Sequence, residues 1–394
     1  MKKMMFAIGF ILSLSGFAQG TDSIKEKSDT HLQLYSQLPK NAEDLNRVSI
    51  SVVDGIVRTF SRFSIPGLIN VNSTFPGKEQ MALLANINDM PFEGLQLAGF
   101  VNLNNELHKS TSISGLGNLT NLSADGALIS GTFNYSGGSF DGMQLTGGIN
   151  ISNGSMKGVQ LTGGINVATN YFEGSQISGG LNYSSGTFKG VQLSGFANFA
   201  NNFEGTQLSP FYNQARNAKG FQLALINVAD SMDGFPIGLL SIVKRNGYST
   251  IEIGSTLNLY NSVKLKMGVK NFYNIYGVTM LYSPNGNMWG VGMGFGSRTD
   301  FNYRIGLEFD YVTWHISNLN DVALYYNQLQ EFDVNLNFRL AKHFTIFAGG
   351  GLNIHSTNRT NSRLPNVSTD LKYSVVNKYM AVHMWPTVNF GIKI

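Results

Sequence analysis

The 394-residue sequence contains no cysteine. Disulfide bonds and thiolate metal sites are therefore excluded. A lipoprotein needs a cysteine directly after its signal peptide, so a lipid anchor at that position is excluded too.

Charge is also scarce, because only 13% of the residues are charged and the formal net charge is +4. Loss of Lys2 and Lys3 with a signal peptide would lower it to +2. Nucleic-acid binding needs clustered lysine and arginine, so we expect no nucleic-acid partner. Beyond the N-terminal segment no apolar run approaches the length of about 18 residues that predicts a transmembrane helix.

The N-terminus itself has the pattern of a secretory signal peptide. A short basic stretch, Met1 to Met4, precedes the apolar run Phe6 to Phe17, and small residues stand where a signal peptidase cuts. We predict a signal peptide over residues 1–18, cleaved before Gln19, followed by a polar leader over residues 19–45. An exported chain without helical spans can still enter a membrane as a closed β-barrel, and the 45 Gly, 27 Phe and 16 Tyr suit one.

One nine-residue sequence motif recurs every 16 residues through the middle of the chain. Its clearest copies are Gly94–Asn102, Gly142–Asn150, Gly158–Asn166 and Gly190–Asn198. With Gly as position 0, Leu or Ile occupies position +3 in ten consecutive copies. About twelve units fit between Arg62 and Lys244, and residues 48–57 are predicted as a first, capping strand. A fixed period predicts a repeat architecture, which we place at residues 46–245.

Apolar and polar residues alternate within each unit, as in a β-strand with one packed side. Val191 and Leu193 fall on the apolar face, which we predict to be packed, and Gln192 and Ser194 fall on the other. An aromatic or Met side chain two positions before the Gly is out of phase with this alternation. The Gly permits a bend that would return these side chains to the interior, at Phe92, Phe140, Met156, Phe172, Phe188 and Phe203.

Sixteen residues could form one coil of a parallel β-solenoid or one transmembrane strand plus a turn. Position −1 favours the solenoid because it is charged in ten of ten units, and the sign alternates except at Asp125 and Asp141. Stacked coils would place these charges side by side about 4.8 Å apart, where alternation relieves repulsion. The ten residues are Glu93, Lys109, Asp125, Asp141, Lys157, Glu173, Lys189, Glu204, Lys219 and Asp233.

The repeat stops near Gly247, and longer alternating segments fill residues 246–394. In one of them, Phe309 and Tyr311 oppose Glu308 and Asp310. About eight such strands, rich in aromatic residues, favour an antiparallel membrane β-barrel with aromatic girdles over a soluble β-sandwich.

The chain resembles the leptospiral-type surface-repeat proteins common in Bacteroidetes. The resemblance is carried by the repeated motif, by the stretch Pro236–Ile253 and by Phe272-Tyr-Asn-Ile275. The resemblance covers about residues 60–394. It implies a cell-envelope protein with no assigned enzymatic activity. Some members of that family are similar to lipoproteins, which this cysteine-free chain is not.

No constellation of catalytic or metal-binding residues is apparent, so we expect neither an enzyme nor a cofactor. The six histidines lack metal-ligand spacing, although His343, His355 and His383 could converge at one barrel end. The repeated glutamines and asparagines allow two interpretations: hydrogen-bonded ladders between coils, or a polar face that binds glycan. The candidate face comprises Gln144, Gln160, Gln176, Gln192 and Gln207.

These patterns predict an all-β, non-enzymatic protein of the outer membrane or cell surface, with a structural, adhesive or ligand-display role. Its expected partners are outer-membrane lipid and a glycan or surface-protein ligand. The alternative is a transport protein, in which all strands form one porin-like barrel.

Overall fold

The computed structural model describes residues 68–72, 78–256, 260–281, 288–318, 327–358, 373–376 and 380–394. The predicted signal peptide, polar leader and capping strand lie outside these residues. Contacts divide the chain into two compact units, residues 1–204 and 205–394. Among the described residues, no helix has the length and apolar character needed to cross a membrane.

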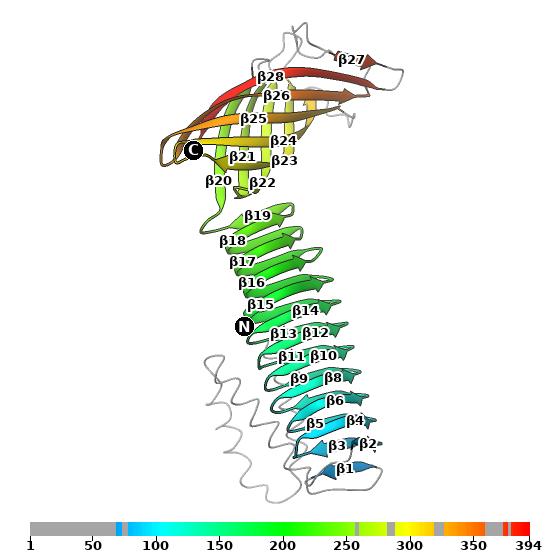
Figure 1. Ribbon diagram of the computed structural model, residues 1–394. Coiled ribbons are helices and arrows are strands. Elements are labelled where there is room, and N and C mark those ends of the chain that lie inside the picture. Colours follow the sequence, from blue (N-terminus) through cyan, green and yellow to red (C-terminus); the bar gives the residue numbers. More distant parts are fainter. Residues whose placement is uncertain are drawn as a thin grey trace, which may run out of the picture. The chain divides into compact units, whose positions relative to one another are not determined.

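Residues 69–243 form a β-solenoid of about 11 turns (Figure 1). One leg of the early turns is built by β2 (Glu79–Ala82), β4 (Phe92–Ala98), β6 (Leu107–Ser114), β8 (Ala124–Ser130), β10 (Phe140–Thr146), β12 (Met156–Thr162) and β14 (Phe172–Ser178). The other leg is built by β1 (Ile69–Asn72), β3 (Ala85–Asn88), β5 (Val101–Asn104), β7 (Gly117–Thr120), β9 (Phe133–Ser136), β11 (Ile149–Ser152) and β13 (Ile165–Ala168). Longer strands then follow: β15 (Leu181–Ser194), β16 (Ala197–Leu208), β17 (Tyr212–Leu223), β18 (Ile226–Ile237) and the short β19 (Leu240–Val243).

Neighbouring turns pair in parallel and in the register of the sequence repeat. Gly142 lies opposite Gly158, and the charged position pairs Asp141 with Lys157. On the other leg Asn150 lies opposite Asn166. The predicted solenoid and its register are thus confirmed. The alternative of one large barrel is wrong for the repeats, because barrel strands joined by short connections would pair antiparallel.

The predicted inside and outside of the repeat are reversed. Val191 and Leu193, predicted to be packed, are 39% and 42% exposed, whereas Gln192 and Asn198 are fully buried. Burying an amide is costly only when it lacks a hydrogen-bond partner. Identical amides stacked in register provide those partners, so the polar face can point inward.

The prediction for the out-of-phase aromatic residues is confirmed. Phe172, Phe188 and Phe203 are buried and stack on one another, with ring centroids 5.0 and 6.0 Å apart. The glycine two residues later has a φ between +117° and +146° in nine turns. At Gly158 a Cβ atom would lie 2.0 Å from the carbonyl oxygen of Gly142, so this bend requires glycine.

One turn departs from the repeat where the sequence does. Ser110 lies opposite Gly126, in the column of bend glycines, and the register shifts between Leu107 and Ser110. The chain makes the bend at Lys109 instead, whose φ of 44° is the one positive value at a non-glycine among the described residues. A carboxylate oxygen of Asp125 accepts a hydrogen bond from the Lys109 amide. The irregularity therefore has a local cause, the missing glycine.

The remaining strands form a closed, eight-stranded antiparallel β-barrel. They are β20 (Tyr248–Thr256), β21 (Tyr260–Val269), β22 (Phe272–Leu281), β23 (Met288–Asp300), β24 (Ile305–Asn318), β25 (Asn327–Ala341), β26 (Phe344–Thr357) and β28 (Ala381–Lys393). The short β27 (Tyr373–Val376) pairs only with β28 among the described strands. Pairing of β20 with β28, Glu252 opposite Lys393, closes the barrel. The predicted strand number is confirmed, and the sandwich alternative is wrong because the sheet closes on itself.

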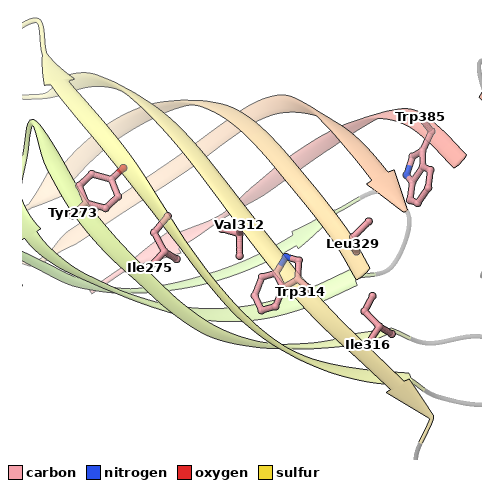
Figure 2. Packing of buried hydrophobic residues seen from close by; sticks show 7 residues of the cluster. All are labelled: Tyr273, Ile275, Val312, Trp314, Ile316, Leu329 and Trp385. Carbon is pink, nitrogen blue, oxygen red and sulfur yellow. The ribbon is translucent and has the colours of Figure 1, made fainter. Parts of the chain in front are cut away.

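Apolar side chains cover the outside of the barrel, while polar and aromatic side chains fill its interior. Phe309 and Val334 are exposed, and their neighbours Glu308 and Asp333 are buried. Figure 2 shows Tyr273, Trp314 and Trp385 among the side chains of the buried cluster in the barrel. Two of the three tryptophans, Trp314 and Trp385, therefore lie inside the barrel and not on its outer wall.

Parallel pairing continues to Val243, and antiparallel pairing begins at Tyr248. The chain therefore changes its type of sheet within residues 244–247. The contact-based division falls earlier, inside the solenoid.

Candidate functional site

The five glutamines of the predicted binding face are fully buried: Gln144, Gln160, Gln176, Gln192 and Gln207. Gln160 donates through Nε2 to Gln144 Oε1 at 2.8 Å, and Gln176 donates to Gln160 at the same distance. Gln192 continues the series with a bond to Gln176, also 2.8 Å long. They form an internal ladder and not an exposed face, so the glycan-binding interpretation is corrected. An exposed face would have needed the apolar residues to be buried instead.

The glutamine ladder has two unsatisfied ends, and both follow from the sequence. Leu128 replaces glutamine in the turn before Gln144, and Pro236 replaces it in the turn after Gln222. Within the described residues, Gln144 Nε2 and Gln222 Oε1 are accordingly buried without a hydrogen-bond partner. Gln160, Gln176, Gln192 and Gln222 each donate to the preceding turn, so a first donor and a last acceptor are left over.

The asparagine column forms a second internal ladder at the corner of the coil. Asn150 Nδ2 donates to Asn166 Oδ1 and to the Leu161 carbonyl, each at 3.0 Å, and to the Gln144 carbonyl at 3.2 Å. One amide thus ties its own turn to the next turn. This explains why asparagine recurs where the chain changes from one leg to the other.

The strongest concentration of ionisable side chains lies inside the barrel. Five acidic and four basic residues project inward from six strands, and all nine are buried. They are Glu252 on β20, Lys264 and Lys266 on β21, Arg298 on β23, Glu308 and Asp310 on β24, Glu331 and Asp333 on β25, and Lys393 on β28. Their formal charges sum to −1 when all are ionised.

Lys266 is at the centre of this network and is fully buried. Its ammonium lies 2.5 Å from Glu252, 2.6 Å from Asp310 and 3.3 Å from Glu308. Lys393 approaches the same two glutamates from β28 and also donates to Asn337 Oδ1 at 2.7 Å. Two ammonium groups therefore lie among three carboxylates that come from two different strands, β20 and β24.

Lys264, two residues before Lys266 on β21, contacts a second group of carboxylates. Its ammonium lies 3.3 Å from Glu331 and 3.4 Å from Asp333. The Trp314 indole donates to Glu331 Oε2 at 2.7 Å. Tyrosine hydroxyls complete the network, because Tyr248 donates to Glu308 at 2.6 Å and Tyr273 to Asp310 at 2.7 Å. Buried charges are tolerated only when paired in this way.

Glu252, Glu308 and Asp310 are the one group in the described part of the chain with the spacing of a metal site. Lys266 lies within 3.3 Å of all three carboxylates, so the chain already supplies their counter-charge. No step of acid–base or nucleophilic catalysis is apparent for groups held this tightly. The arrangement is suited to filling and crosslinking the barrel interior.

A second part of the barrel interior holds polar side chains with unused hydrogen-bonding atoms. Asn335 and Asn353 are buried, and neither amide nitrogen nor oxygen has a partner among the described protein atoms. Thr387 Oγ1 and Asn389 Oδ1 on the adjacent β28 are in the same condition. A buried polar region of this kind normally takes up ordered water.

Of the three histidines that could converge at one barrel end, two lie close together. His355 and His383 lie opposite each other on β26 and β28, with ring centroids 6.2 Å apart. His343 lies in the turn at the other end of β26, so it does not join them.

Sequence reasoning missed the charged network in the barrel. The signal was present, since Lys264 and Lys266 alternate with Val263 and Leu265, as do Glu308 and Asp310 with Phe309. Alternation identified the two faces, but the partners come from strands up to 141 residues apart, from Glu252 to Lys393.

No family model matches the chain, and neither a curated protein nor a solved structure matches it.

Proposed function

We propose that this chain is a non-enzymatic protein of the bacterial cell envelope whose barrel spans the outer membrane. The observation that carries the proposal is that the barrel has apolar side chains on its outer wall and charged side chains in its interior, the reverse of a water-soluble protein. Its outward residues, such as Val278, Val291 and Phe309, are apolar and exposed, while lysines and carboxylates are buried inside. Water would favour the opposite arrangement, whereas hydrocarbon favours this one.

Strand geometry agrees with the proposal. Strands β23 to β26 have 13 to 15 residues, which exceeds the 9 to 11 residues that cross the hydrocarbon core. An apolar groove on the outer wall, lined by Ile253, Val263, Val278, Met280 and Phe390, suits contact with acyl chains. Lipid is the partner that these residues support.

The solenoid has a structural role in this proposal. Its amides are used within the coil, so the earlier reason to expect a glycan ligand no longer holds. The resemblance to surface-repeat proteins of Bacteroidetes is consistent with an envelope protein of this kind. The structure does not favour the porin-like alternative. The interior of an eight-stranded barrel is narrow enough to be filled by side chains, and here Tyr273, Trp314 and the ion pairs occupy it.

Envelope fractionation tests the proposal. We expect the full-length protein in the outer-membrane fraction, retained after washes with high salt and alkaline carbonate and released only by detergent. A matched pair of variants sharpens the test. Val334→Arg places a charge on the outer wall and should cost about 2–4 kcal/mol near the membrane centre. Leu193→Arg changes an equally exposed solenoid leucine and should leave membrane insertion unchanged. A protein that appears in the soluble fraction would rule the proposal out.

A further inference from the structure

The two ends of the barrel differ in their connections. At one end, residues 270–271, 301–304 and 342–343 join strands by short turns. At the other end the connection at residues 257–259 is also short, but the three that follow are longer: residues 282–287, 319–326 and the stretch 358–380, which contains β27. Outer-membrane barrels place short turns in the periplasm and longer loops outside the cell.

The chain enters and leaves the barrel at the short-turn end. Tyr248 begins β20, and Glu252 of the same strand pairs with Lys393 near the end of β28. The Ile251 amide donates to the Ile394 carbonyl at 3.0 Å, which places the C-terminal residue at this end too.

The last solenoid strand is connected to that same end by a short segment. β19 ends at Val243 and β20 begins at Tyr248, so residues 244–247 are the entire link. Fully extended, the step from Val243 to Tyr248 spans roughly 18 Å. The apolar band of an outer-membrane barrel is about 25 Å tall, so this link does not cross it.

A direct contact within the unit of residues 205–394 agrees with this placement. Asn274 is the third residue of β22, which begins directly after the short turn at residues 270–271. Its Nδ2 donates to the carbonyl oxygen of Gly238, between β18 and β19, at 2.7 Å.

We infer that the solenoid lies on the periplasmic side of the outer membrane and that the segment containing β27 lies at the cell surface. This inference rests on the proposed function, since it requires the barrel to span that membrane. It changes where a partner of the repeats is to be sought. The solenoid surface is exposed to the periplasm and can bind partners there. A ligand outside the cell can contact only the barrel loops.

The absence of cysteine makes the test simple. We would place single cysteines at Thr132, an exposed solenoid residue, and at Val375, exposed on β27. A membrane-impermeant maleimide is applied to intact producing cells, and in parallel to cells whose outer membrane has been permeabilised. We expect Val375→Cys to be labelled in both samples and Thr132→Cys to be labelled only after permeabilisation.

Labelling of Thr132→Cys on intact cells would overturn the inference, as would failure of Val375→Cys to react there. Equal labelling of both variants after permeabilisation is the control for folding and accessibility. Fractionation of the same cells separates the two hypotheses. Protein absent from the outer membrane would contradict the proposed function, whereas protein present there with the reversed labelling pattern would contradict only the sidedness.

Discussion

Gln160 Nε2 donates to Gln144 Oε1 over 2.8 Å, although both side chains are completely buried in adjacent solenoid turns. This bond explains how the repeat can turn its polar face inward. Each glutamine in the run meets an identical group one turn away, so the cost of burying the amide is offset by bonds to its neighbours. The apolar residues at positions +1 and +3 are then left on the outside.

The middle of the ladder should be more sensitive to mutation than its end. Gln176→Leu would remove two bonds and leave Gln160 Oε1 and Gln192 Nε2 without their ladder partners, which should destabilise the solenoid by about 1–3 kcal/mol per unsatisfied group. Gln222→Leu removes only the bond to Gln207. Thermal unfolding of the full-length protein, followed by circular dichroism, compares the two. Equal losses would mean that the ladder is not the stabilising feature.

The broken end of the ladder can be extended. Leu128→Gln would give the unpaired Gln144 Nε2 an acceptor, so we expect an unchanged or higher unfolding midpoint. The same exchange at Leu107, a buried leucine in the aromatic column, offers no such partner and should lower the midpoint. A large loss from Leu128→Gln would contradict the explanation given for the ladder end.

Replacement of a bend glycine, such as Gly158, should strongly destabilise the solenoid. Gly158→Ala combines a φ of +119° with a Cβ only 2.0 Å from a carbonyl oxygen of the preceding turn. Backbone strain alone costs about 1–3 kcal/mol, and the clash adds to it. Gly350→Ala in the barrel is the control, because its Cβ would meet nothing closer than 3.5 Å. Denaturant unfolding should show a clear loss for the first variant and little change for the second.

The charged column predicts that the effect of a charge reversal depends on both neighbours in the column. Asp141 lies between Asp125 and Lys157, so Asp141→Lys exchanges repulsion from Asp125 for repulsion from Lys157 and should leave the unfolding midpoint nearly unchanged. Glu173→Lys would place a new positive charge between Lys157 and Lys189 and should lower it. Exposed pairs contribute less than about 1 kcal/mol, and high salt should abolish the loss caused by Glu173→Lys. Shifts that persist at high salt would point to another cause.

The stability of the barrel to unfolding should depend strongly on Lys266. Lys266→Met removes the ammonium shared by Glu252, Glu308 and Asp310 and should cost about 3–5 kcal/mol, because Lys264 and Lys393 contact only the two glutamates of this group. The triple variant Lys266→Met, Glu252→Gln, Asp310→Asn should recover much of that loss, because the uncompensated charges are removed. Lys270→Met, at an exposed pair with Asp300, is the control. The temperature at which the detergent-solubilised barrel unfolds measures each effect.

Much of the fold could be predicted from the sequence, because the repeat is regular. The 16-residue period and the alternating charges gave the parallel register, and the bend glycines gave the inward aromatic column. Which of the two faces of each strand is buried could not be predicted in the same way. Alternation at Val191, Gln192 and Leu193 identifies two faces, but which one is buried depends on hydrogen bonds between turns. In the barrel, likewise, Lys266 and its carboxylates come together only through the closure of the sheet.

The central claim is that one chain combines a water-exposed solenoid with a barrel whose apolar wall faces lipid. Nitroxide labels on single cysteines test it most directly after reconstitution into bilayers. Sites at Val278, Val291 and Val334 on the barrel wall should collide frequently with oxygen and rarely with a water-soluble nickel complex. A label at Leu193 on the solenoid should show the reverse. Frequent collisions with the nickel complex at all four sites would contradict the account.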